Sequence, residues 1–160
     1  MDDAEWRALD DLSIDEVLVE FVVSVDTSAI DEAGTDSNIF FGIDGVEFLL
    51  DHPDYNDFER GDRDHYHFAF VREMTVDDLN RAQLTLRNEG DGRNAGWYCA
   101  RVRLFAQPEG PACMYLYEEW KDVGWLARDG DAGLLRVLQV GVAPQAGASH
   151  APRSSSSKQR

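Results

Sequence analysis

The strongest structural signal in the chain is the stretch Leu50-Asp51-His52-Pro53-Asp54-Tyr55-Asn56-Asp57-Phe58-Glu59-Arg60-Gly61. It follows an apolar run and carries four carboxylates and one amide. A second oxygen-rich turn, Ala33-Gly34-Thr35-Asp36-Ser37-Asn38, comes earlier, directly before the apolar residues 39–41. Because hard cations such as Ca²⁺ take about six to eight oxygens from carboxylates, carbonyls and water, both turns are candidate calcium loops.

Length and composition predict a single globular domain. The chain has 160 residues, of which 43% are hydrophobic, with 8 Phe, 5 Tyr and 4 Trp to build a core. No run approaches the roughly 20 apolar residues of a membrane span, and the start has no signal-peptide layout, so a cytoplasmic location is expected. Cys99 and Cys113 give no disulfide framework, and Cys99 is predicted to be a buried hydrophobe.

The charge of the chain excludes most polyanionic partners. The formal net charge is −16, and the stretch from Ala143 onward contains three basic residues and no acid, so the rest carries about −19. Such a body is repelled by DNA, RNA and anionic lipid unless cations intervene. Nucleic-acid binding is therefore not expected.

Short β-branched and aromatic runs separated by turn signals predict an all-β fold. The predicted strands cover 17–26, 38–43, 46–50, 65–70, 82–87, 97–105, 113–117 and 134–140. Their spacing, with no long helical period between them, indicates an antiparallel β-sandwich. One short helical turn is predicted around 6–12 and a capped turn at 75–79. The expected organisation is an acidic lead-in at 1–16, the sandwich at 17–142 and a disordered tail at 143–160.

At these residues the chain resembles the PLAT domain, a family named for polycystin, lipoxygenase and alpha-toxin. The resemblance rests on the order of Gly34-Thr35-Asp36, Leu49-Leu50-Asp51, the run 55–61, Trp97-Tyr98-Cys99 and a late Trp120, and it covers roughly 17–140. It implies an eight-stranded antiparallel β-sandwich of two four-stranded sheets, in agreement with the strand count.

The resemblance also implies calcium ligands, because the loops at one end of lipoxygenase and alpha-toxin domains bind Ca²⁺ and dock on membrane. A first site would use Asp36 with main-chain oxygens near Glu32 and Gly34. A second would use the side chains that follow: Asp51, Asn56, Asp57 and Glu59. Gly34 is interpreted as the residue that lets the backbone turn its carbonyl inward.

The chain departs from the family pattern at two places. The family often has an aspartate just before the tryptophan, where this chain has Arg93-Asn94-Ala95-Gly96-Trp97, so that Asn94 or Asp91 would substitute. The lipid-inserting loops of lipoxygenases carry exposed apolar residues, whereas the equivalent stretches here offer only Ile30 as a wedge.

Structural explanations compete with each functional one. The loop around Asp57 is also explained as a turn closed by side-chain-to-backbone hydrogen bonds. His65 and His67 share a strand face, and without a third ligand at useful spacing they are predicted to pack rather than bind zinc. Trp97 and Trp120 are predicted anchors of the sandwich, Trp125 is left open between buried and exposed, and 118–122 is predicted to be a polar connection.

Two functions remain open from the sequence. The first is a free-standing non-catalytic module that binds Ca²⁺ and then docks on a lipid headgroup, as a peripheral membrane contact, or on a protein. The alternative is a metal-independent protein-interaction domain that recognises a basic partner. The sequence has no nucleophile elbow, ordered catalytic triad, iron site or phosphate loop, so we expect no enzyme activity.

Overall fold

The computed structural model describes residues 7–35, 37–52, 57–89, 96–110, 113–126 and 135–138. Its strands are β1 (Val17–Thr27), β2 (Ile39–Ile43), β3 (Val46–Leu49), β4 (Arg63–Thr75), β5 (Leu84–Asn88), β6 (Trp97–Pro108), β7 (Tyr115–Leu126) and β8 (Leu135–Leu138). A 3₁₀ turn, η1 (Leu9–Asp11), and a short helix, α1 (Val76–Arg81), complete the described elements.

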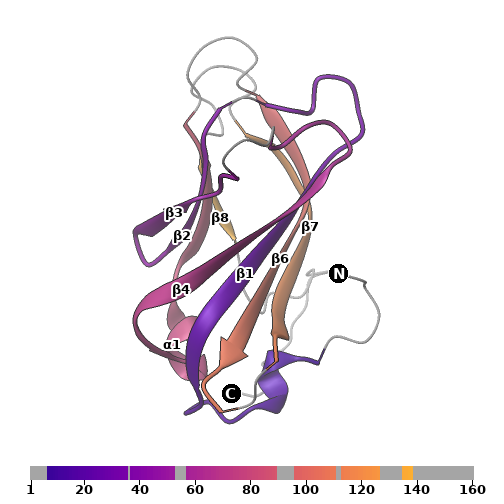
Figure 1. The fold of residues 1–160 in the computed structure, drawn as a ribbon. Coiled ribbons are helices and arrows are strands. Elements are labelled where there is room, and N and C mark those ends of the chain that lie inside the picture. Colours follow the sequence, from indigo (N-terminus) through magenta and orange to yellow (C-terminus); the bar gives the residue numbers. More distant parts are fainter. Residues whose placement is uncertain are drawn as a thin grey trace, which may run out of the picture.

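The strands form two four-stranded sheets packed face to face (Figure 1). One sheet has the order β4-β1-β6-β7 and the other β3-β2-β5-β8, with every neighbouring pair antiparallel. Since strand alternation turns every second side chain toward the opposite sheet, the two inner faces together make one core. The predicted all-β sandwich of two four-stranded sheets is confirmed.

The core is built around the central strand β1, which pairs with both β4 and β6. Its residues Phe21, Val23 and Val25 are fully buried. The ring of Phe21 lies 5.0 Å from that of Phe48 and 4.8 Å from that of Phe70, centroid to centroid. These contacts join the edge strands β3 and β4 across the space between the sheets.

Both predicted tryptophan anchors lie as expected from the sequence. Trp97 is fully buried, and Trp120 is half-buried against the core. Trp125, which the sequence left open, is half-buried and packs edge-to-face on Tyr98 with ring centroids 5.3 Å apart. Cys99 is fully buried, as predicted, and burial raises the pKa of its thiol well above the ordinary value.

The predicted polar connection at 118–122 is wrong, because these residues lie inside the long strand β7. One of these charged residues forms an ion pair with the neighbouring strand: Glu119 accepts a hydrogen bond from Arg101 on β6 at 3.1 Å. Trp120 is the partner of Val102 in the same ladder. Cross-strand ion pairs allow a polar run to form a strand whose outer face is charged.

Two local elements close the end of the sandwich opposite the loops (Figure 1). Helix α1 begins at a capping box in which Thr75 Oγ1 accepts from Asp78 N and Asp78 Oδ2 accepts from Thr75 N, each at 3.0 Å. This confirms the predicted capped turn. The turn η1 places Leu9, only 1% exposed, in the main core, so the lead-in contributes to the folded domain.

Candidate functional site

The two oxygen-rich loops lie against each other at one end of the sandwich. Thr35 N donates to the Phe58 carbonyl at 3.2 Å, and an ion pair joins Asp31 to Arg60 at 2.7 Å. Two segments that are separated by a β-hairpin in the sequence therefore form one surface, which we call the loop end.

Gly34 is required here by the close approach of the second loop. A Cβ at this position would lie 2.9 Å from the Phe58 carbonyl oxygen and 3.1 Å from Arg60 N. Both neighbours are backbone atoms, which cannot swing away as a side chain would. Because glycine has no side chain, the two loops can approach this closely.

Trp97 anchors the loop end to the core. Its indole Nε1 donates to Thr27 Oγ1 at 2.8 Å, and its ring packs edge-to-face on Phe58 with centroids 5.2 Å apart. The next residue, Tyr98, donates its backbone N–H to the Ala33 carbonyl at 3.0 Å. The strand that begins at Trp97 therefore fixes both loops at once.

Asp57 turns inward and accepts three hydrogen bonds. Its Oδ1 accepts from Tyr66 Oη and from His52 Nδ1, each at 2.8 Å, and its Oδ2 accepts from His52 N at 3.0 Å. Only 7% of its side chain is exposed. These three hydrogen bonds replace the contacts with water that the carboxylate loses on burial.

The His52 ring bridges the loop and the sheet. Opposite its contact with Asp57, Nε2 lies 2.6 Å from the His65 carbonyl oxygen on β4. The imidazole also stacks on Tyr66, with centroids 4.3 Å apart and planes 14° from parallel. Burial, followed by the hydrogen bond to Asp57, raises the pKa of the Tyr66 phenol far above its usual range, so this group remains a donor.

Asp64 is the second buried carboxylate of the loop end. It is 3% exposed, and its Oδ2 accepts from Phe58 N at 3.1 Å. Burial raises the pKa of Asp64 and, although the Phe58 N–H opposes this, the negative charges of Asp57 and Asp62 raise it further. Asp57 and Asp64 are thus close enough to repel each other at a poorly hydrated position.

The predicted calcium ligands are distributed unevenly. Glu32 and Asp51 are exposed, with Glu32 at a φ of 63°, and Glu59 is half-buried. In the described part of the chain, three side chains of types that can bind a metal have potential ligand atoms within 4.8 Å of one another: His52, Asp57 and Asp64. Asp36, Asn56 and Asn94 lie outside the described residues, and the full ligand set stays a prediction.

Sequence reasoning missed His52, Asp64 and Tyr66 as members of this network. Asp64 and Tyr66 alternate on β4, and both are buried, so the period of the strand was the available signal. His52 lies in a loop 13 residues before His65, and this spacing alone does not indicate a shared site. Only the folded chain shows that the loop returns to the strand.

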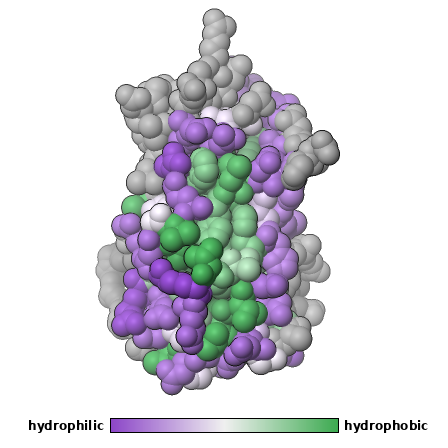
Figure 2. Space-filling view, turned by 60° about the vertical axis from the view of Figure 1, so that its left-hand side comes forward, coloured by the Kyte–Doolittle hydropathy of each residue, from purple (hydrophilic) through white to green (hydrophobic). Residues whose placement is uncertain are grey.

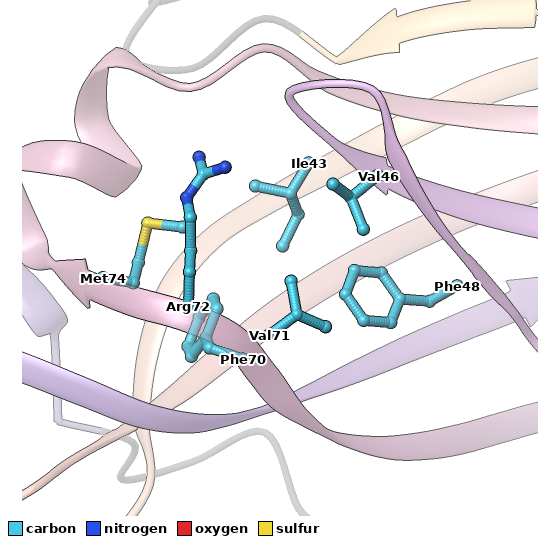
Figure 3. A pocket seen from close by; sticks show the side chains of 7 residues that line it. All are labelled: Ile43, Val46, Phe48, Phe70, Val71, Arg72 and Met74. Atoms are coloured by element: carbon cyan, nitrogen blue, oxygen red, sulfur yellow. The ribbon is translucent and has the colours of Figure 1, made fainter.

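A second candidate, the apolar groove between edge strands β3 and β4, is too small for a ligand. Figure 2 shows a hydrophobic band with hydrophilic margins on the face where these edges lie. Figure 3 shows the lining side chains, among them Phe48, Phe70 and Val71, with Arg72 at the rim. The cavity of about 10 Å³ has room for roughly one water molecule.

The described helices include none that is long and apolar enough to cross a membrane. The two four-stranded sheets, with the two loops in contact at one end, define the class of the fold: an antiparallel β-sandwich of two four-stranded sheets.

The family follows from the comparisons with known proteins. The PLAT/LH2 domain model matches residues 21–123, and the chain belongs to this family. Human lipoxygenase homology domain-containing protein 1 is 29% identical over 127 residues, which is 74% of this chain and 6% of the relative. The chain therefore spans only a small part of that relative.

Solved structures show the same fold. The alpha toxin from Clostridium absonum superposes with a TM-score of 0.63 at 27% identity, covering 82% of this chain and 34% of the toxin. A calcium-dependent 11R-lipoxygenase, whose structure suggests a mechanism for its regulation by Ca²⁺, superposes with a TM-score of 0.53 at 27% identity. That match covers 78% of this chain and 18% of the lipoxygenase.

Proposed function

We propose that this domain is a non-catalytic module that uses its loop end, with Ca²⁺, to dock on a lipid headgroup or a protein. The observation that supports this proposal is the contact between the two acidic loops, in which Thr35 N bonds to the Phe58 carbonyl and Asp31 pairs with Arg60. The similarity to a calcium-dependent lipoxygenase supports the choice of cation. The proposed location is the cytoplasm, with peripheral membrane contact.

The chemistry of the donors suits a hard cation. Asp51 and Glu59 supply carboxylate oxygens near the surface, and the first loop would add Asp36 with main-chain oxygens near Glu32 and Gly34. Asn56 and Asn94 would add amide oxygens. A bound Ca²⁺ would neutralise the acidic loop end and offer coordination positions to an anionic headgroup.

Calcium titration of the whole chain tests this proposal. Since a ligand that binds only the folded state stabilises it, millimolar CaCl₂ should raise Tm, and a chelator should reverse the change. Sedimentation with vesicles that contain phosphatidylserine should require Ca²⁺, with MgCl₂ as the matched control. A Tm that does not respond to CaCl₂ would reject the calcium-dependent function.

A second function, metal-independent binding of a basic protein, is favoured by one specific observation. Both oxygens of Asp57 already accept hydrogen bonds from within the protein, so this part of the loop end closes without a metal. A chain of net charge −16 is complementary to a basic partner. Binding of an oligolysine peptide that is equal in CaCl₂ and in chelator would support this function over the first.

A further inference from the structure

We propose that the outer face of the sheet β4-β1-β6-β7 carries a carboxylate-binding site at Ser24 and Arg103, and that the acidic residues 1–6 of this chain occupy it. The inference goes beyond the proposed function, because this face lies outside the loop end and needs no metal. It rests on side chains that are buried on the outer face of the sheet and on the charges around them.

The first step is an apolar pair that is buried on the side of the sheet away from the core. Strand alternation turns Phe21 and Val23 of β1 into the core, so Val22 between them points to the outer face. Its partner on β6 is Phe105, which shares that face. Val22 is only 7% exposed and Phe105 is fully buried. Burial of such a pair on an outer face indicates that a further part of the chain packs over it.

The second step is the next cross-strand pair, in which a hydroxyl and a cation are buried. Ser24 is the partner of Arg103 on β6, and the two residues are 1% and 3% exposed. Within the described residues, Ser24 Oγ has no hydrogen-bond partner. A buried hydroxyl needs a partner, and a buried guanidinium needs a counter-charge. A carboxylate suits both, because one oxygen can accept from the hydroxyl while guanidinium donors bind the group as a charged pair.

The third step is the charge of this face, which is opposite to that of the whole chain. The outward side chains in the cross-strand rows through Ser24 and Asp26 include more cations than carboxylates. The cations are Arg63, Arg101, Arg103 and Lys121, and the carboxylates are Asp26 and Glu119. In a chain of net charge −16, this local excess of positive charge attracts an anionic segment.

The fourth step is the position of the acidic segment in the chain. Met1-Asp2-Asp3-Ala4-Glu5-Trp6 contains three carboxylates, two large apolar side chains and no cationic side chain. The described residues begin directly after it, where the Arg7 carbonyl accepts from Leu116 N at 2.7 Å and Ala8 forms a β-bridge to Leu116. Leu116 is the partner of Phe105. The acidic segment therefore joins the folded domain at the margin of the buried face.

The acidic segment is also long enough to reach the site. Six extended residues span about 20 Å, whereas the distance from β7 over β6 to β1 is about 10 Å. The described elements outside the sheets, η1 and α1, lie at one end of the sandwich and not over the middle of this face (Figure 1). The chain from Ala143 onward has three basic residues and no acid, so the same cations repel it. Residues 1–6 are therefore the occupant that the charges favour.

A thiol at position 24 tests directly whether the face is covered. Ser24→Cys is close to the parent in size and is placed in a Cys113→Ser background, where the remaining native thiol, Cys99, is fully buried. The neutral reagent iodoacetamide is used, so that its rate does not depend on the charge of the surface. In the folded whole chain the thiol at position 24 should be alkylated slowly, because it is out of contact with solvent.

Neutralisation of the acidic segment should expose this thiol. In Asp2→Asn/Asp3→Asn/Glu5→Gln the thiol at position 24 should be alkylated on the order of tenfold faster. Val71→Cys is the matched control, since Val71 is 66% exposed and lies on the edge of β4 beside the apolar groove. Its rate should be the same with and without the three substitutions. An unchanged rate at position 24 would overturn the proposal.

Thermal melting tests the same contact without a new cysteine, in case Ser24→Cys does not fold. The variant with the neutralised segment should melt below the parent, because the buried cation loses its counter-charge. Asp11→Asn/Asp15→Asn removes exposed carboxylates from the same lead-in and should not lower Tm, since it only reduces self-repulsion. A neutralised segment that leaves Tm unchanged would overturn the proposal. These variants leave the loop end intact, so the calcium titration decides the proposed function separately.

Discussion

Asp26 shows at the scale of one residue how the acidic chain uses its few cations. Its carboxylate accepts from Arg63 Nε at 2.8 Å and from Arg101 Nε at 3.0 Å, which ties β4, β1 and β6 together on the outer face. Burial raises its pKa, but the two guanidinium hydrogen bonds outweigh burial, so the net pKa lies below the ordinary 3.8.

Replacing Asp26 by asparagine should lower the free energy of unfolding by about 2 kcal/mol near neutral pH, since both arginines lose a charged acceptor. A lowered carboxylate pKa contributes stability above the unfolded-state value and loses it as pH falls through the folded-state value. Urea unfolding should therefore give a constant difference from the parent above about pH 5 that shrinks below 3.8. A difference that persists unchanged in acid would contradict this account.

Gly34 gives a second prediction for a single residue. Gly34→Ala should destabilise the protein by roughly 1–3 kcal/mol, because the new Cβ would press on the backbone of the second loop. Gly110→Ala is the control: among the described residues its Cβ would meet Glu16 Oε2, at an ordinary 3.5 Å, and the substitution should change stability by less than about 0.5 kcal/mol. Equal melting of the two variants would show that the loops can separate freely.

At the scale of elements, the capping box of α1 is the clearest local determinant. Thr75→Ala removes the hydroxyl that accepts from Asp78 N, and should cost about 1 kcal/mol of stability by thermal melting. Thr75→Ser keeps the hydroxyl and should melt close to the parent. If Thr75→Ala and Thr75→Ser had the same Tm, the packing of Val76 and Leu79 alone would be enough to stabilise the helix.

The strands and this cap were predictable because their signals are local: alternation in β1, turn residues between strands, and Thr75 three residues before Asp78. The extension of β7 through Glu119 was not predictable from the sequence, because it depends on an ion pair with Arg101 of β6. The contacts of His52 were not predictable either, since its partners Asp57 and His65 lie 5 and 13 residues further along the chain. The sequence identified Gly34 as important, but for a different reason. Glycine is required there by the close approach of Phe58 and not by the conformation of its own backbone.

At the scale of the whole molecule, the net charge of −16 opposes folding and favours basic partners. Raising NaCl from about 20 mM to about 0.5 M in chelator shortens the Debye length from roughly 20 Å to a few ångströms. Self-repulsion is then screened, so Tm should rise with salt. Surface ion pairs such as Asp31–Arg60 weaken under the same salt, but each contributes little.

The same salt should weaken association with an oligolysine peptide, because screening removes the attraction that steers encounter. Stopped-flow association in chelator should therefore slow as NaCl rises, while Tm moves upward over the same range. An oligoglutamate peptide of equal length is the control and should not bind at either salt concentration. If oligolysine binding proved independent of salt, the acidic surface would not be its determinant, and the contact would have to be apolar.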